Sequence, residues 1–349
     1  MARVVIAGAG ATGASIAYHL ARRGARDVIL CDLGRVASGA TSKAMGGVRQ
    51  QFLTRAEVEL ARRSVRFFDE LGPPLFHQVG YLFFATTDEG AAELERRREL
   101  LRSFGVPVKR AEPTTSVHSA DVRGAIACWE DGVADPTGVT QELVRRAVEL
   151  GVELRENADA LALPRDVLVL ATGAWSHSVG ERVGVSLPVR PLVRQLVDVG
   201  PADEVEPELP MTIELESGFH FRHVDGNRLR LAMPEAEARW DGPSTVREEL
   251  VQDWLRRLAH RVPSARDARV IRAWAGFYDM TPDAHPIIGW VRDDVYAACG
   301  FSGHGFMQSP AVGEAAAAEL LGAEPPFDLS PYRLERFAED AEFPETLVL

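Results

Sequence analysis

The sequence predicts an α/β fold that opens with a strand, a helix and a second strand, and three observations in residues 4–32 support it. Residues 4–7 and 28–31 are short apolar runs, as expected for buried parallel strands. Between them, three glycines in the pattern Gly-x-Gly-x-x-Gly precede apolar residues at helical spacing, Ile16, Ala17, Leu20 and Ala21. An acid, Asp32, directly follows the second run. This order is typical of a dinucleotide-binding unit.

Each glycine of this turn has a physical reason to be there. Gly8 permits a tight turn after the first strand, and Gly10 lets the backbone approach a pyrophosphate without a Cβ in the way. Gly13 allows the helix to pack closely on the strand, and the N–H groups of its first turn then face the phosphates. Asp32 lies where a carboxylate accepts hydrogen bonds from an adenosine ribose. We therefore favour nucleotide binding over a purely structural turn, but the stretch does not choose between NAD and FAD.

Composition narrows the class of protein. The 349 residues, 46% hydrophobic and 26% charged, suit one large or two interleaved globular domains. A formal charge of −12 argues against a nucleic-acid or anionic-membrane partner. The three cysteines, Cys31, Cys128 and Cys299, are far apart in apolar surroundings, so we expect reduced core residues of a cytoplasmic protein and neither disulfides nor metal ligands. We expect no export signal and no membrane span.

The remainder of the chain alternates between helical and strand-like patterns. Residues 34–49 predict a loop of small and polar residues. Helices are predicted over residues 56–71, 89–104, 137–150, 248–260 and 310–321. Strands are predicted over residues 76–86, 125–129, 152–154, 166–170, 270–280 and 295–299. Residues 189–199 and 211–233 are predicted to be rich in β-structure, and within them residues 218–222 and 228–231 predict a hairpin around Asp225-Gly226-Asn227.

Four segments carry a family resemblance that spans most of the chain. They are GAGATG (8–13) with Asp32, SGATSKAMGGVRQQF (38–52), VLATGAWS (169–176), and MTPDAHPIIG (280–289) followed by CGFSGHGFMQSPAVGE (299–314). Together they resemble the FAD-dependent amino-acid and amine oxidoreductases, which include sarcosine oxidase, glycine oxidase and D-amino-acid oxidase. The last segment is most similar to sarcosine oxidase, to the β subunits of sarcosine oxidase and dye-linked proline dehydrogenase, and to the dimethylglycine dehydrogenases.

The resemblance implies a fold, a cofactor and a reaction. The implied fold is a doubly wound, Rossmann-like FAD-binding domain interleaved with an antiparallel β-sheet substrate domain. Residues 1–75, 137–185 and 281–349 are expected in the FAD domain, and residues 76–136 and 186–280 in the substrate domain. The implied reaction is oxidation of the C–N bond of an amino acid or of a secondary or N-methyl amine. Oxygen or another electron acceptor would then take the electrons.

All four segments contribute predicted cofactor contacts. The glycine-rich loop of the last segment delivers a helix N-terminus, whose N–H groups and dipole favour negative charge on the pyrimidine side of a flavin. The predicted cofactor-binding residues are Gly8, Gly10, Ala11, Thr12, Gly13, Asp32, Ser38, Thr41, Ser42, Gly46, Gly47, Ala171, Gly173, Trp175, Gly300, Gly303, His304, Gly305, Phe306 and Met307.

Departures from the resembled family refine these expectations. The cysteine that tethers the flavin in covalent sarcosine oxidases is replaced by Gly276, so FAD is expected to bind non-covalently. Met307 replaces the lysine that holds the substrate carboxylate, whereas Arg49 matches the arginine of that clamp. We predict Arg49 as the substrate anchor, Arg222 as a second candidate, and His304 as a residue lining the flavin.

Two other functions remain open from the sequence alone. The dinucleotide-binding unit also suits an NAD-linked dehydrogenase, and a flavoprotein subunit or assembly factor would keep FAD as a structural group. A partner subunit or a homo-oligomer is compatible with either reading.

Overall fold

The structure is a computed structural model that describes residues 2–339, and its strands form three sheets. The six-stranded sheet has the strand order β16-β17-β10-β1-β2-β9. Its strands are parallel except β16, which runs antiparallel to β17. Their bounds are Val4–Ala7 (β1), Val28–Cys31 (β2), Glu153–Arg155 (β9), Val167–Leu170 (β10), Ile287–Arg292 (β16) and Val295–Cys299 (β17).

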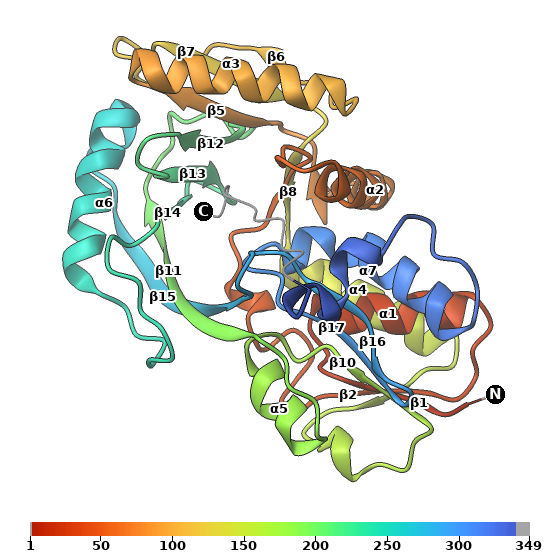
Figure 1. Cartoon of the computed structure of the whole chain (residues 1–349). Helices are drawn as coiled ribbons and strands as arrows, with labels where there is room; N and C mark the ends of the chain where they lie inside the picture. Colours follow the sequence, from red (N-terminus) through yellow and green to blue (C-terminus); the bar gives the residue numbers. More distant parts are fainter. Residues whose placement is uncertain (1, 340–349) are drawn as a thin grey trace.

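Both faces of this sheet are covered, which explains why its strands are apolar at consecutive positions. Val4 and Ile6 pack into one core cluster with residues of α1 (Ala11–Arg22), α4 (Pro136–Glu149) and α7 (Gly305–Leu320). These three helices lie together on one side of the sheet (Figure 1). Val5 and Ala7 point to the opposite side of the sheet, into a second cluster. Val179 of α5 (Ser176–Arg182) packs against this cluster. The observed α/β, doubly wound arrangement confirms the predicted fold class.

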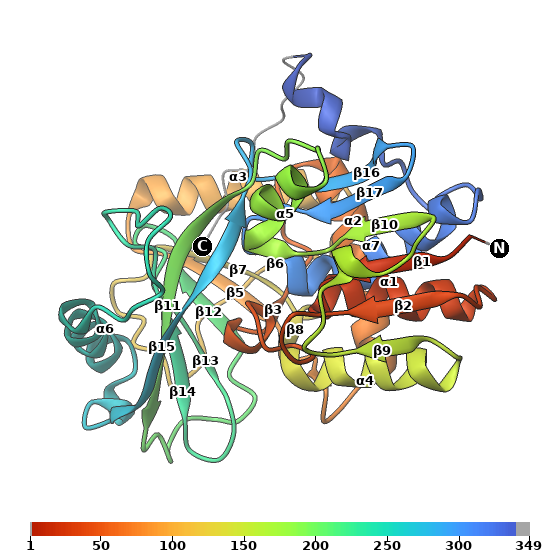
Figure 2. The ribbon, with the colours of Figure 1, turned by 90° about the horizontal axis from the view of Figure 1, so that it is seen from below.

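The eight-stranded sheet is mostly antiparallel, with the order β15-β11-β14-β13-β12-β5-β7-β6. Its longest strands, β11 (Arg190–Gly200) and β15 (Arg269–Met280), pair along their whole length and form an extended ribbon (Figure 2). The core beneath α6 (Glu248–Arg261) includes Trp254, and α3 (Asp88–Ser103) covers the end of the sheet near β5 and β7 (Figure 1). The other strands are β5 (Tyr81–Ala85), β6 (Lys109–Arg110), β7 (Gly124–Cys128), β12 (Met211–Glu214), β13 (His220–His223) and β14 (Leu229–Ala232).

A third, three-stranded sheet joins distant parts of the chain. It consists of β3 (Gly47–Val48), β8 (Gly132–Ala134) and β4 (Phe76–His77), in the order β3-β8-β4. Helix α2 (Arg55–Leu71) follows β3, and Thr54 caps it by accepting a hydrogen bond from the Glu57 backbone N–H at 3.2 Å. Strands of the six-stranded sheet fall in the ranges expected for the FAD domain and those of the eight-stranded sheet in the ranges for the substrate domain. The boundaries themselves stay a prediction.

The predicted strand over residues 76–86 is wrong as a single element. Two strands, β4 and β5, replace it and belong to different sheets. Gly80 separates them with φ +90°, a conformation that interrupts a strand and that glycine adopts without steric penalty. A Cβ at this position would lie 2.5 Å from the Trp129 ring.

The last long helix begins earlier than predicted, at Gly305, so Pro310 lies inside α7. Proline has no N–H, and within a helix it leaves the carbonyl four residues before it without a donor. Here the Ser309 hydroxyl donates to the Phe306 carbonyl at 2.9 Å and replaces the missing hydrogen bond. Pro310 is therefore tolerated inside the helix. Between residues 2 and 339, no helix combines the length and the apolar character needed to cross a bilayer.

Candidate active site

A cavity of about 560 Å³ lies between the carboxyl ends of the parallel strands and the β11–β15 ribbon. That volume is within the range of small-molecule and cofactor sites. One end is lined by Asp32, Gly34 and Ala158–Leu161, and the other by Arg194, Leu196 and Gly276–Asp279. Ligands of open α/β sheets bind at this edge, because the strands there end beside helix N-termini.

Asp32 is fixed at the first end by the backbone around it. Its Oδ2 accepts a hydrogen bond from the Ala9 N–H at 2.7 Å, and its Oδ1 accepts one from the Gly34 N–H at 2.7 Å. An ionised carboxylate can accept about four hydrogen bonds, so two such bonds leave capacity for ligand hydroxyl groups. The carboxylate therefore suits the role expected of it, binding a ribose.

The glycine-rich turn forms the next part of the wall. Gly8 has φ +107°, and a Cβ there would lie 2.3 Å from the Ala171 carbonyl oxygen. Gly10 is the N-cap of α1 and supplies no side-chain hydrogen bond to the helix, while the Thr41 hydroxyl accepts from the Ala11 N–H at 3.1 Å. A helix N-terminus of this kind, lining the cavity at Ala11 and Thr12, suits a pyrophosphate. The residues present thus fit a dinucleotide.

The loop before α7 faces the second end of the cavity. Asp279 Oδ2 holds this loop by accepting from the N–H groups of Gly300 and Phe301, at 2.8 and 3.1 Å. Burial raises the pKa of Asp279 to about 6, although these hydrogen bonds favour its charged form. Gly303 has φ +94°, and a Cβ there would lie 2.4 Å from the Tyr278 ring. The loop and the ribbon therefore meet in close contact at the cavity wall.

The structure brings most of the predicted cofactor-binding residues to this one cavity. Those on its wall are Gly8, Gly10, Ala11, Thr12, Asp32, Ser38, Thr41, Ala171, Gly173, Trp175, Gly303, Gly305 and Phe306. The predicted residues that are not on its wall are Gly13, Ser42, Gly46, Gly47, Gly300, His304 and Met307.

Close packing against neighbouring backbone or side-chain atoms explains three of the glycines that lie away from the cavity. A Cβ on Gly13 would lie 1.9 Å from the Gly8 carbonyl oxygen, which is the helix-to-strand contact expected of it. Cβ atoms on Gly46 and Gly47 would lie 2.5 Å from the Ala134 carbonyl oxygen and 2.6 Å from the Tyr81 hydroxyl. These glycines shape the loop behind the cavity, and their predicted contact with the cofactor stays a prediction.

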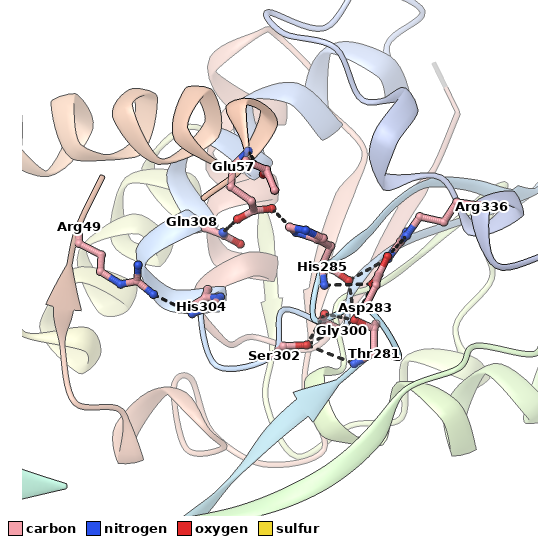
Figure 3. Close-up of polar contacts among 11 residues, drawn as sticks. Arg49, Glu57, Thr281, Asp283, His285, Gly300, Ser302, His304, Gln308 and Arg336 are labelled. Atoms are coloured by element: carbon pink, nitrogen blue, oxygen red, sulfur yellow. Dashed lines mark hydrogen bonds and ion pairs between the residues drawn. The ribbon is translucent and has the colours of Figure 1, made fainter. Parts of the chain in front are cut away.

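Arg49 and His304 are buried, and their side chains point toward one another (Figure 3). Arg49 Nη1 donates to the Gln51 carbonyl oxygen, and Nη2 lies 3.2 Å from His304 Nε2. The guanidinium also stacks over the Phe52 ring, 4.1 Å from its centroid. The structure therefore joins two of the three residues predicted to anchor the substrate or to line the flavin, but it does not bring either to the cavity wall.

Arg222, the third of these residues, is held by backbone carbonyls. Its Nε donates to the Met45 carbonyl at 2.8 Å and its Nη1 to the His223 carbonyl at 3.0 Å. Burial, followed by the positive charge of Arg230, lowers the pKa of Arg222 to about 9. It is absent from the cavity wall as well. Its bond to Met45 ties the eight-stranded sheet, here called the substrate sheet, to the segment just before β3, which Arg49 follows.

Sequence reasoning missed a buried polar network that anchors the start of α7 (Figure 3). Glu57 Oε1 lies 2.9 Å from His285 Nδ1, and Glu57 Oε2 accepts from Gln308 Nε2. Gln308 is one helical turn beyond His304, whose carbonyl accepts its N–H at 3.1 Å. Glu57 and His285 are 228 residues apart, and no local pattern connects them.

A second missed residue, Arg194, lies on the cavity wall itself. It is on β11 opposite Gly276 of β15, and its guanidinium carbon lies 5.6 Å from the centre of the Tyr278 ring. Its Nε and Nη1 atoms are buried and have no hydrogen-bond partner among the described residues. One arginine among many on strands gives no signal in the sequence that could have singled it out.

A site at the carboxyl edge of a doubly wound sheet, closed by the wall of a second sheet, is typical of proteins that bind a dinucleotide. Comparison with known proteins specifies the family. A family profile described as "FAD dependent oxidoreductase" matches residues 3–319, and the chain belongs to this family. FAD is therefore the cofactor, which resolves the choice that the glycine-rich turn left open.

Similar proteins cover nearly the whole chain. Glycine oxidase of Geobacillus kaustophilus is 29% identical over 95% of this chain and 96% of its own length. FAD-dependent oxidoreductase domain-containing protein 1 of Bos taurus is 30% identical over 96% of this chain and 84% of its own. The crystal structure of L-proline dehydrogenase from P. horikoshii superposes with a TM-score of 0.89, at 27% identity, over 97% of this chain and 98% of that one.

Proposed function

We propose that this enzyme oxidises the C–N bond of a small amino acid or of a secondary or N-methyl amine. Two similar proteins are named for such substrates, a glycine oxidase and an L-proline dehydrogenase. The observation that carries the proposal is the cavity. It runs without interruption from Asp32, at the expected ribose end, to Tyr278 and Arg194 on the substrate sheet. A cofactor and a small substrate would thus share one continuous cavity.

When bound, FAD supplies the electron-accepting chemistry, and the chain supplies binding and orientation. Asp32 and the first turn of α1 would hold the dinucleotide end. The aromatic side chains of Tyr278, Phe301 and Phe306 line the opposite end and exclude water from a C–H bond that must approach the flavin closely. No side chain is assigned as a general base, because removing a hydride from a neutral amine requires none.

The remaining expectations about this enzyme are part of the proposal. Oxygen or another electron acceptor would reoxidise the flavin. The enzyme would work with a partner subunit or as a homo-oligomer, whichever acceptor it uses. The three cysteines are buried and unpaired as disulfides, which is consistent with the proposed cytoplasmic location.

Anaerobic reduction of the bound flavin tests the proposal without requiring the natural electron acceptor. The purified holoenzyme is mixed with glycine, N-methylglycine, L-proline, D-proline or 4-methylaminobutanoate, and flavin absorbance is followed. We expect at least one of these amines to bleach the flavin. Acetate and propionate serve as controls, because they have the carboxylate but no C–N bond. If no amine reduces a fully loaded enzyme, FAD serves another purpose here and the proposal is wrong.

A further inference from the structure

We propose that Arg194 binds the carboxylate of the substrate, and that this enzyme therefore acts on amino acids in preference to plain amines. The inference rests on the proposed function and specifies its substrate class. It assigns the anchoring role to a residue of the substrate sheet, in place of Arg49.

The first argument is the environment of the Arg194 guanidinium. Its Nε and Nη1 are buried and without an acceptor among residues 2–339, and the side chain lines the cavity. Leaving a buried donor without an acceptor is unfavourable, and more so when the donor belongs to a charged group. A ligand that brings an acceptor into the cavity recovers this cost. A carboxylate suits best, since its two oxygens match the planar guanidinium.

The second argument is that the acidic residues of the cavity are already engaged elsewhere. Asp32 accepts from the N–H groups of Ala9 and Gly34, and Asp279 accepts from those of Gly300 and Phe301. The third acid on the wall, Asp159, forms an ion pair with Arg182 at 2.8 Å. Within the described part of the chain, no ion pair neutralises Arg194 at 4 Å or less.

The third argument is that the other two candidate arginines already donate hydrogen bonds to acceptors within the protein. Arg49 donates to the Gln51 carbonyl and to His304 Nε2, and Arg222 donates to two backbone carbonyls. Neither lines the cavity. Arg49 nevertheless adds its positive charge to the potential at this end of the cavity. Besides burial, the charges of Arg194 and Arg49 both lower the pKa of His220, and both oppose the rise in the pKa of Tyr278 that burial causes. A positive potential at this end of the cavity attracts an anion.

The position of Arg194 also favours the substrate over the cofactor as its partner. The adenosine and phosphate contacts lie at the opposite end, around Asp32 and α1. Arg194 projects from the substrate sheet beside Tyr278, opposite the loop that contains Gly303. A flavin carbonyl would be a single neutral acceptor, whereas a carboxylate brings the opposite charge and two oxygens that match the guanidinium fork.

The test compares Arg194→Ala, Arg194→Lys and a matched control in the holoenzyme. The control is Arg190→Ala, which removes an exposed arginine from the same strand, paired with Asp241 at 2.6 Å. The first measurement titrates acetate against acetamide and follows the flavin spectrum, so it needs no turnover. The second measures kcat and KM for L-proline against pyrrolidine and for N-methylglycine against dimethylamine.

We expect Arg194→Ala to raise the Kd of acetate and the KM of the amino acid by about ten- to a hundredfold, the range for a lost hydrogen bond to a charged group. Acetamide binding, FAD affinity and kcat/KM for the plain amines should change less than about twofold, as should every quantity in Arg190→Ala. Arg194→Lys should recover part of the loss, because it restores the charge but not the planar fork. Should the Ala variant not fold, Arg194→Gln carries the same expectation.

Several results would overturn this assignment. They are an equal loss for amino acids and plain amines, a loss of FAD affinity that would mark Arg194 as a flavin contact, or a carboxylate-selective loss in Arg49→Ala but not in Arg194→Ala. A parent enzyme that prefers plain amines would also reject the inference while leaving the proposed function intact. An enzyme that oxidises no amine would reject the proposed function, and acetate binding would still decide the role of Arg194.

Discussion

Asp32 holds the turn around it through two backbone hydrogen bonds, and we propose that the same carboxylate binds the ribose of FAD. We expect Asp32→Ala to weaken FAD binding by about 1.5–3 kcal/mol, since a hydrogen bond to a charged group has this value. Asp32→Asn should lose less, because its amide oxygen still accepts from one of the two N–H groups that hold the turn. FAD affinity is measured by fluorescence titration of the apoprotein.

The control for this prediction is Asp27→Ala, which removes a carboxylate that precedes the same strand and pairs with Arg3 at 3.1 Å, away from the cavity. Its FAD affinity should equal that of the parent. Equal affinities for all three variants would show that Asp32 does not hold the ribose.

His220 predicts a pH dependence of stability. Burial lowers the pKa of its imidazole from 6.5 to about 4, with smaller contributions from the charges of Arg194 and Arg49. Between pH 6.5 and 4 the unfolded chain binds a proton at this histidine and the folded chain does not. The free energy of unfolding therefore falls as the pH falls through this window, by up to about 1.4 kcal/mol per pH unit for this residue.

His220→Gln should make this decline shallower, as measured by urea unfolding at pH 7, 6 and 5. His19 remains in the variant, and burial lowers its pKa to about 4 too, so part of the decline persists. His77→Gln, at an exposed histidine, should decline like the parent. A decline in His220→Gln as steep as that of the parent would contradict the assignment.

At the scale of elements, the sequence predicts what local chemistry determines. The bounds of β1, β2 and β17 are as predicted, because apolar runs closed by turn residues identify buried strands. The predicted helix starts, except that of α7, are also near their observed places. Thr87 and Asp135, which cap α3 and α4 by accepting from backbone N–H groups, are residue types that favour this position.

The errors arise where a distant contact decides the outcome. The interruption of the strand at Gly80 accommodates the Trp129 ring. Helix α7 can begin before Pro310 because the Ser309 hydroxyl replaces the N–H donor that proline lacks. The position of Arg49 is fixed partly by His304, 255 residues away. The residue type of an arginine identifies it as a candidate anchor, but only the fold reveals which arginines already have acceptors.

The loop before α7 carries a prediction at this scale. Gly303→Ala places a Cβ in a left-handed conformation, φ +94°, and 2.4 Å from the Tyr278 ring. The control is Gly322→Ala just beyond the end of α7, with φ +70° and no atom within 4 Å. Both variants force an alanine into a left-handed backbone conformation, which destabilises the folded chain. Only Gly303→Ala also adds a steric clash, which costs about 1–3 kcal/mol. We expect it to unfold at lower urea and to bind FAD more weakly than Gly322→Ala. Equal effects would show that Tyr278 moves without cost.

For the molecule as a whole, the cavity joins the two large sheets, since its wall includes Asp32 beside β2 and Tyr278 on β15. A ligand that fills it contacts both and binds only the folded chain. Such a ligand adds about 2.7 kcal/mol to the free energy of unfolding when its concentration is a hundred times its Kd. FAD should therefore raise the Tm of the apoprotein in a concentration-dependent manner.

The same binding should be reversible, because the chain has no thiol where a flavin tether would be expected. Gly276 occupies that place on the cavity wall, and a Cβ there would already lie 3.0 Å from Lys43 Cβ. Of the three cysteines, only Cys31 lines the cavity, beside Asp32 at the far end from Gly276. Heat or acid denaturation should therefore leave all of the yellow flavin in the supernatant, with none on the precipitated chain. Parallel denaturation of Gly276→Cys serves as a comparison that offers a thiol at the right place. Flavin absorbance that stays with the denatured parent chain would show a covalent link and overturn the prediction.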